Sequence, residues 1–271
     1  MDKSSVFTFV KKYSFIGIIL ILLLAGCSGI NEPIDENATG WFDYYFVYHF
    51  SLLIKWLATF LNGSYGLSII IITLIIRLAI MPFMIKQTRN SLEVQDKMKI
   101  IKPEMEAIQK KYKDKNDVQS KNEMQQELMK LYQQHNFNPL ASFSGCLPLL
   151  IQMPILFAFY HAIRRTPEIA AHNFLWFNLG STDILLTILA VAIYFIQSRV
   201  TLIGLDEAQR KQMSMIGIIS PVMIGVISLN APAALPLYWA VGGLFIIFQT
   251  LISKKIYLSH KREQEQKNEI G

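Results

Sequence analysis

Charged residues are scarce in this chain. They make up 17% of its 271 residues, against about 25% in soluble globular domains. Hydrophobic residues make up 52%, and they occur in blocks of about 20, the length that a helix needs to cross the roughly 30 Å hydrocarbon core of a bilayer. A soluble cytoplasmic enzyme is therefore excluded, and the pattern predicts an all-α membrane protein.

Cysteine and catalytic motifs are also sparse. The chain has two cysteines, Cys27 and Cys146, which excludes a disulfide-rich scaffold. It contains no P-loop, G-x-S-x-G or H-E-x-x-H sequence, and its five histidines are scattered. We therefore expect neither an enzyme nor a protein with a metal or another cofactor.

The N-terminus has the features of a lipoprotein signal peptide. Three lysines, Lys3, Lys11 and Lys12, precede an apolar run, residues 14–24, that is too short for a comfortable membrane span. The run ends in Leu-Ala-Gly-Cys, which resembles a lipobox. The sequence therefore predicts a signal peptide at 1–26, attachment of a fatty acyl group such as palmitate to Cys27, and an outer tether at 27–40. An uncleaved anchor with an incidental cysteine is the alternative.

Aromatic residues are concentrated in segment 41–61, where Asp43, His49 and Lys55 interrupt them. This amphipathic composition predicts an interfacial helix on the outer leaflet, with an additional membrane span as the alternative. The following core, residues 62–255, is expected to contain five membrane spans and a cytoplasmic hairpin. The expected spans are 65–85, 139–162, 183–203, 213–229 and 235–253.

Lysine and arginine are distributed unevenly among the connecting segments. Segment 86–136 has eleven and the tail 256–271 has three, whereas the outer tether has none. By the positive-inside rule the basic segments are cytoplasmic, which leaves the N-terminus outside. Arg164 and Arg165 are the exception, because they fall on the outer side. The net charge of +6 favours anionic lipid headgroups, with ribosomal RNA as a second candidate and no DNA partner.

Apolar residues in segment 86–136 recur with heptad spacing. They step by four and three residues from Val94 to Tyr112, and the spacing resumes after the polar stretch 113–117. The pattern predicts an antiparallel pair of helices that projects into the cytoplasm, with the first arm broken or kinked at Pro103. Its mixed charges fit either a solvated surface or a docking surface for a partner.

One charged residue lies deep inside a predicted span. Arg77 is nine residues from Lys86, roughly 13 Å along a helix, and burying it costs about 3 kcal/mol or more without water or a partner. The interiors of the five spans contain no Asp or Glu, which disfavours an ion-coupled transporter. We therefore predict a positive, hydrated pocket open to the cytoplasm, with a purely structural arginine as the alternative.

The other polar residues of the spans are uncharged. Thr73 lies one helical turn before Arg77 on the same face. Side chains that could share the pocket from other spans are Gln152, Gln197, Ser198 and Gln249. For each amide, an ordinary hydrogen bond between helices is the alternative role.

Several motifs resemble the YidC membrane protein insertases, the bacterial relatives of the mitochondrial Oxa and chloroplast Alb insertases. The motifs are Arg77 with Pro82, Lys-Pro-Glu-Met at 102–105, Asn-Pro at 138–139, Gly-Cys-Leu-Pro-Leu-Leu-Ile-Gln-Met-Pro-Ile at 145–155, and Leu-Pro-Leu-Tyr-Trp at 235–239. The resemblance covers about residues 60–255. The lipobox without a large outer domain is similar to the lipoprotein-type members of Gram-positive bacteria. One departure is Gly242-Gly243, where the family pattern has an asparagine at the second position.

The resemblance implies a groove that is closed to the outside and open to the cytoplasm and the lipid. Arg77 would be its functional arginine, and Thr73, Gln152, Gln197 and Trp239 would be groove residues. The family's activity is the insertion and folding of nascent membrane proteins in the bacterial cell membrane, alone or with the Sec translocon, without a through-pore or nucleotide hydrolysis.

The hairpin 86–136 and the basic tail would meet the incoming substrate, the ribosome or the targeting machinery. The N-terminus would be lipid-anchored outside and the C-terminus cytoplasmic. Two other classes remain as alternatives: a channel or transporter, and an assembly factor for which the charge of Arg77 does not matter.

Overall fold

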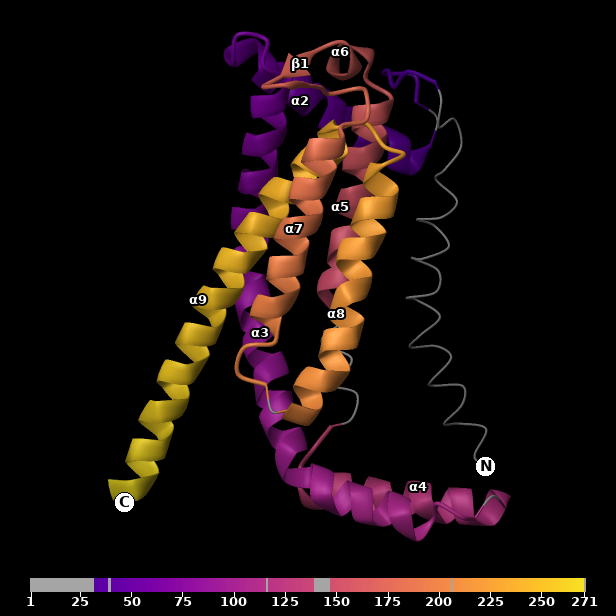
Figure 1. Cartoon of the computed structure of the whole chain (residues 1–271), viewed down its shortest axis with the longest axis vertical. Coiled ribbons are helices and arrows are strands. Elements are labelled where there is room, and N and C mark those ends of the chain that lie inside the picture. The colour runs from indigo at the N-terminus through magenta and orange to yellow at the C-terminus, as the bar shows by residue number, and fades with distance from the viewer. Residues whose placement is uncertain (1–31, 39, 116, 139–146, 206, 271) are drawn as a thin grey trace. The chain divides into compact units, whose positions relative to one another are not determined.

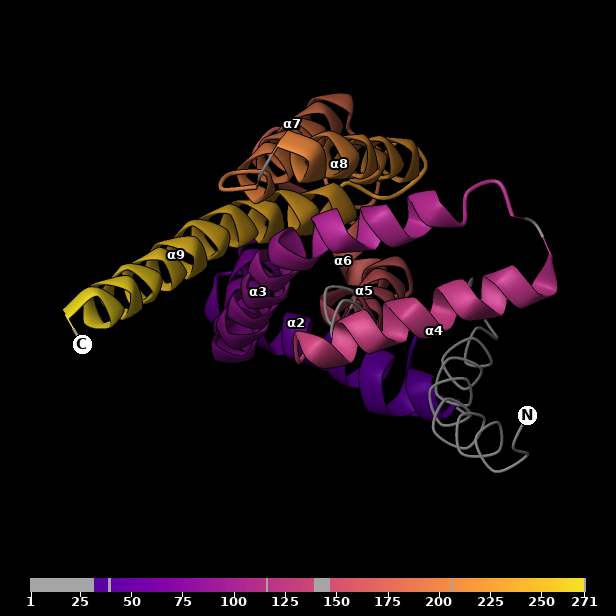
Figure 2. The ribbon, with the colours of Figure 1, turned by 90° about the horizontal axis from the view of Figure 1, so that it is seen from below.

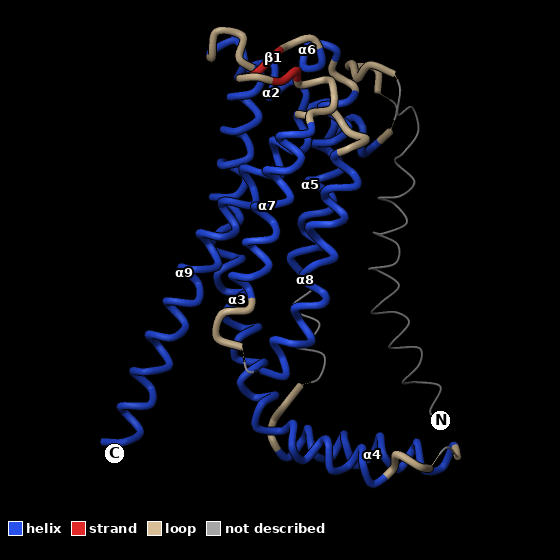
Figure 3. The backbone as a smooth tube through the Cα atoms, in the orientation of Figure 1, coloured by secondary structure: helices blue, strands red, loops and turns tan. Residues whose placement is uncertain are grey.

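The computed structural model describes residues 32–38, 40–115, 117–138, 147–205 and 207–270 (Figure 1). The predicted signal peptide, Cys27 and Cys146 lie outside these residues. The described chain is mostly helical, as its composition predicted, with a single small two-stranded sheet (Figure 3). It divides into two units, the first formed by residues 1–77 and 151–247 and the second by residues 78–150 and 248–271.

The first unit contains most of the helices. Its elements are the π-helical turn η1 (Asp43–Tyr48), α2 (His49–Phe60), the start of α3 (Tyr65–Lys111), most of α5 (Leu147–Arg164), α6 (Pro167–Ala170), β1 (Asn173–Phe174), β2 (Phe177–Asn178), α7 (Ile184–Thr201), α8 (Glu207–Ser228) and the start of α9 (Ala234–Ile270). In Figure 1, α7 and α8 run alongside one another, and α2, α6 and β1 gather at one end.

The core of the first unit draws apolar side chains from all its helices. Among the largest fully enclosed ones are Ile54 of α2, Ile69 of α3, Phe159 of α5 and Leu235 of α9. Burying such a side chain contributes about 1.5–3 kcal/mol. Segment 41–61 therefore packs into the core with one face, while its other face exposes aromatic residues. The exposed aromatic residues are Trp41, Tyr44, Tyr45, Trp56 and Phe60.

A buried ion pair joins segment 41–61 to the end of α5. Nη1 of Arg165 lies 2.7 Å from Oδ2 of Asp43, and each side chain is only 7% exposed. Nε of Arg165 also donates to the carbonyl oxygen of Glu32. The sequence analysis treated Arg165 as an exception to the charge distribution. The structure instead shows that its charge is neutralised inside the protein.

Three of the described helices are long and apolar enough to cross a membrane. They are Tyr65–Lys111, Ile184–Thr201 and Ala234–Glu263. Two shorter apolar helices, Leu150–Arg164 and Met213–Ser228, overlap the second and fourth expected spans. The first eight residues of the expected span 139–162 lie outside the described part. A helical membrane protein is therefore supported, and the count of five spans remains a prediction.

The second unit consists of the rest of α3, helix α4 (Val118–Gln134) and the rest of α9. Figure 2 shows α4 side by side with the C-terminal part of α3. Ile101 of α3 and Leu131 of α4 are buried together, and Val94, Met98 and Met105 pack around them. The apolar seam seen in the sequence is therefore the surface on which these helices meet.

Polar contacts show that α3 and α4 run antiparallel. Lys111, at the end of α3, pairs with Glu127 at 2.6 Å, whereas the earlier residue Glu104 contacts the later residue His135 at 3.1 Å. The expected break at Pro103 does not occur, because α3 continues through this residue to Lys111. Proline removes one backbone donor, and the packing of neighbouring seam residues offsets that loss.

Candidate functional site

Arg77 is buried in the first unit. It lies on α3 with only 6% of its surface exposed, whereas Ile75 on another face of the helix is 58% exposed. Thr73, one turn earlier, is enclosed as well. The helix therefore turns the two polar residues of this apolar stretch inward, as expected for side chains four residues apart.

No carboxylate neutralises Arg77 within the part of the chain that the structure describes. No hydrogen bond or ion pair of its side chain is found there. The few fully sealed polar side-chain atoms without a partner belong to other described residues. The guanidinium is therefore almost fully enclosed by the protein, and an unpaired buried cation of this kind requires water or a partner.

Two tyrosines and a glycine surround the guanidinium. The positive charge of Arg77 acts electrostatically on the hydroxyl groups of Tyr194 in α7 and Tyr238 in α9. Gly242 lies so close that an added Cβ would be 2.9 Å from Nη2 of Arg77. Helix α3 thus presents its charge to phenol groups and to the bare backbone of α9.

Gln152 joins this group through Tyr238. Its Nε2 donates a hydrogen bond to the Tyr238 hydroxyl, and the ring of Phe159 stacks on the Tyr238 ring with centroids 4.7 Å apart. These contacts hold the phenol of Tyr238 between α5 and α9. The amide of Gln152 therefore makes the interhelical hydrogen bond that was its alternative role, and it does so beside Arg77.

The remaining predicted residues are less closely connected to Arg77. The Thr73 hydroxyl donates to the carbonyl of Ile69 on its own helix at 2.7 Å, and the Gln197 amide donates to Thr201 of α7 at 3.3 Å. Trp239 is buried next to Tyr238. Among the described residues, no hydrogen bond connects Gln197 or Trp239 to Arg77.

The sequence analysis missed Tyr194, Tyr238 and Gly242 as neighbours of Arg77. Tyr238 stands inside the motif 235–239, so its position was visible although its role was not. The departure from the family pattern falls on Gly243, so the sequence analysis assigned no role to the preceding Gly242. The role of Gly242 is steric, because a side chain at this position would occupy the space of the guanidinium.

The fold and this site together define a class of protein: a helical membrane protein with a buried arginine inside an apolar helical unit. The family model for the 60Kd inner membrane protein matches residues 56–261. The chain is 46% identical over 255 residues to "Membrane protein insertase YidC 2" of Listeria monocytogenes, covering 93% of this chain and 91% of that protein. It is 40% identical over 263 residues to "Membrane protein insertase MisCB" of Bacillus subtilis, covering 93% and 95%.

A solved structure is similar as well. The "Active YidC insertase crystal structure with the first transmembrane domain resolved" is 29% identical with a TM-score of 0.56. The match covers 88% of this chain and 51% of that chain, so this protein spans about half the length of the solved insertase. The chain therefore belongs to the 60Kd inner membrane protein family together with the YidC insertases, which confirms the resemblance seen in its motifs.

Proposed function

We propose that this protein is a membrane protein insertase and chaperone, which inserts nascent membrane proteins into the bilayer and helps them to fold. The observation that carries the proposal is Arg77, a buried cation without a carboxylate partner among the described residues. Its relatives bear the name insertase. We further propose that the family topology holds here: five spans, an acylated Cys27 outside and the basic tail in the cytoplasm.

The proposed mechanism uses the charge to guide the polar end of a substrate. A nascent segment with a short acidic outer tail enters the hydrated site, where Arg77 attracts the tail and water shortens its path through apolar surroundings. The membrane potential assists an acidic tail that moves outward by about 2.3 kcal/mol per charge per 100 mV. The apolar part of the substrate then partitions into the bilayer, so neither a through-pore nor nucleotide hydrolysis is required.

Each site residue has a proposed role in this scheme. Tyr238 and Gln152 hold a polar wall beside Arg77, and Thr73, Gln197 and Trp239 line the path of the substrate. The cytoplasmic hairpin 86–136 and the tail 256–271 receive the substrate from the ribosome or the targeting machinery, and some substrates arrive with the Sec translocon. The exposed aromatic face of segment 41–61 lies on the outer leaflet.

The test is insertion of a small single-span protein with an acidic outer tail, measured by protease protection in cells depleted of their own insertase. We compare wild type, Arg77→Ala and Arg77→Lys at matched membrane abundance. Arg199→Ala is the control, because Arg199 is an exposed arginine near the end of α7. We expect loss with Arg77→Ala, rescue with Arg77→Lys and no effect in the control.

A second substrate sharpens the test. The same protein with a neutral outer tail gains less from the positive site, so Arg77→Ala should reduce its insertion less than that of the acidic version. Full insertion of both substrates by Arg77→Ala would contradict the proposed mechanism. It would instead favour an assembly factor, for which helix surfaces matter and this charge does not.

A further inference from the structure

A pocket lies in the second unit where α3 and α9 leave their apolar stretches. The apolar part of α3 ends before Lys86, and that of α9 ends before Lys254. Just beyond these lysines, the two helices enclose a space of about 540 Å³, within the usual range for ligand pockets. Its lining residues are Arg89, Glu93, Asp96, Lys97, Ile100, Tyr257, His260 and Lys261.

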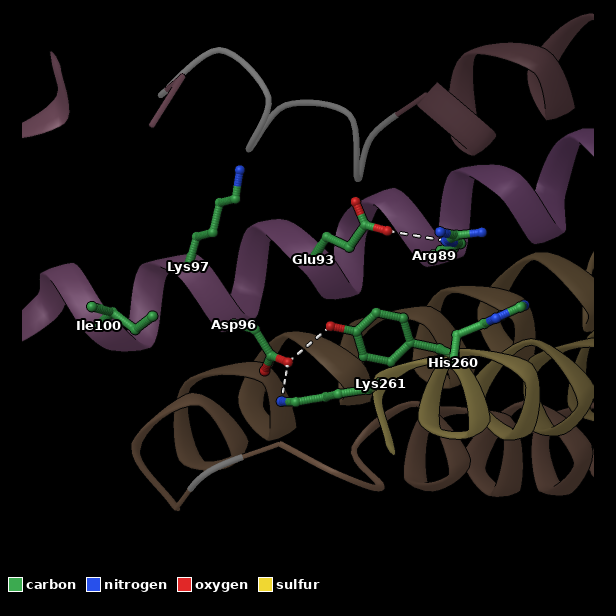
Figure 4. Close-up of a pocket in the computed structure, with 8 residues that line it drawn as sticks. Arg89, Glu93, Asp96, Lys97, Ile100, His260 and Lys261 are labelled. Atoms are coloured by element: carbon green, nitrogen blue, oxygen red, sulfur yellow. Dashed lines mark hydrogen bonds and ion pairs between the residues drawn. The ribbon is translucent and has the colours of Figure 1, made fainter. Parts of the chain in front are cut away.

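One carboxylate in this pocket is already satisfied. Asp96 accepts hydrogen bonds from the Tyr257 hydroxyl at 2.8 Å and from Nζ of Lys261 at 2.6 Å, and Lys99 lies 3.2 Å away. Figure 4 shows the contact between Asp96 and Lys261, which lies in the C-terminal part of α9. These contacts join the two helices and give the pocket a fixed wall. They also neutralise the charge of Asp96, so this carboxylate does not repel an anion strongly.

The other charges leave a positive excess. Nε of Arg89 pairs with Glu93 at 3.0 Å (Figure 4), which leaves the two terminal nitrogens of the guanidinium fork available. Lys97 is exposed, and its side chain makes no hydrogen bond or ion pair with any residue that the structure describes.

We propose that this pocket binds a negatively charged phosphate group, with the headgroup of an anionic phospholipid as its main source and a soluble phosphate compound as the other. Basic pockets between membrane helices at the cytoplasmic surface suit such headgroups. The fork of Arg89 matches two phosphate oxygens, and Lys97 adds a point charge. The site is separate from Arg77 and does not depend on the insertase mechanism.

The experiment is a thermal-unfolding titration of the full chain in neutral detergent micelles. The ligands are short-chain phosphatidylglycerol, short-chain phosphatidylcholine and inorganic phosphate, at constant ionic strength. A ligand that binds only the folded protein raises the melting temperature as its concentration rises. We expect phosphatidylglycerol to stabilise the protein more than phosphatidylcholine does.

Variants of both signs test the charge argument. Each cation near an anionic headgroup contributes about 1 kcal/mol, or about fivefold in affinity. Arg89→Gln should therefore weaken the apparent affinity for phosphatidylglycerol about fivefold, and Arg89→Gln with Lys97→Gln about 25-fold. Glu93→Gln removes a negative charge and frees the Arg89 guanidinium, so it should tighten binding. A misfolded variant would bind more weakly, so misfolding cannot explain a gain in affinity.

The control removes the same charge from another surface of this unit. Lys121→Gln changes an exposed lysine on α4 and should leave the titration unchanged. Stabilisation by inorganic phosphate as strong as that by phosphatidylglycerol would support the site and identify the soluble source. Equal effects of the two lipids without any effect of phosphate would overturn the proposal, as would equal losses in Arg89→Gln and Lys121→Gln.

Discussion

The ion pair between Asp43 and Arg165 tests how the first unit is held together. The two groups lie 2.7 Å apart, and both side chains are 7% exposed. Arg165→Met keeps a long side chain but leaves the carboxylate of Asp43 buried without its partner. Removing one member of a buried pair costs about 3–5 kcal/mol. The variant also loses the hydrogen bond from Arg165 to the Glu32 carbonyl. We therefore expect a loss of stability of about 3–5 kcal/mol.

Hydrogen exchange of the amides in η1 and α2 is the appropriate assay, because these elements carry Asp43. Since about 1.4 kcal/mol corresponds to a factor of ten, Arg165→Met should accelerate their exchange by about 100- to 4,000-fold. The control is Arg164→Met, which removes an exposed arginine that donates to the Tyr160 hydroxyl. We expect the control to change these rates by less than tenfold.

A double variant separates the uncompensated charge from lost packing. Asp43→Leu with Arg165→Met removes both charges, and replacing a buried pair by apolar residues is often close to neutral. The double variant should therefore recover most of the protection. Equal exchange in Arg165→Met and Arg164→Met would refute the reasoning. A double variant as labile as the single one would show that packing, and not the buried charge, governs this contact.

Three other contacts can be tested in the same chain. Gly242→Ala places a methyl group 2.9 Å from Nη2 of Arg77. We expect the flexible guanidinium to move aside while the protein stays folded. Insertion of an acidic-tailed substrate, measured by protease protection, should then fall several-fold. Lys55 donates to Glu168 at 2.7 Å and lowers the pKa of that carboxyl. The pair therefore stabilises the protein at pH values above the ordinary pKa of glutamate, and this stabilisation is lost as the pH falls through the lowered pKa of Glu168. The difference in melting temperature between wild type and Lys55→Gln should therefore shrink in acid. Asp117→Ala removes the side-chain acceptor that caps α4 and should accelerate amide exchange in its first turn.

Two of these variants have a matched control, and the third has an outcome that would contradict it. In an Arg77→Lys background Gly242→Ala should add little loss, because lysine has no atom in the place of Nη2, the only Arg77 atom within 3.0 Å of the new methyl group. Asp117→Asn keeps a capping oxygen and should preserve protection. A Lys55→Gln difference that persists unchanged in acid would contradict the proposed ion pair, and equal exchange in the two Asp117 variants would contradict the proposed cap.

Local periodicity predicted the second unit well. The heptad spacing from Val94 onward identifies the residues that pack between α3 and α4, because the positions that share a helix face follow from sequence spacing alone. The continuity of α3 was harder to predict. Lys86 marked the end of an apolar block, yet the helix continues through it to Lys111. A change in hydropathy ends a membrane span but does not end a helix.

Long-range pairing was beyond the same reasoning. Arg165 finds its carboxylate 122 residues earlier in the chain, and no spacing rule connects two residues so far apart. The expected topology puts both residues on the outer side of the membrane, which is compatible with a pairing. Only the packing of η1 against the end of α5 shows that Asp43, and not another outer carboxylate, is the partner.

The surroundings of Arg77 show a different limit. The charge and the lack of acidic residues in the predicted spans are properties of composition, so the sequence revealed both. Tyr194, Tyr238 and Gly242 depend on which faces of α7 and α9 turn toward α3, and composition is silent on this. The family pattern drew attention to the second glycine of the pair, Gly243, as the place of a missing polar group. The geometry shows that the first glycine, Gly242, matters for Arg77, because a side chain there would displace the guanidinium. The cation on α3 and the missing side chain on α9 are therefore one feature of the molecule, which becomes visible only when the helices are packed.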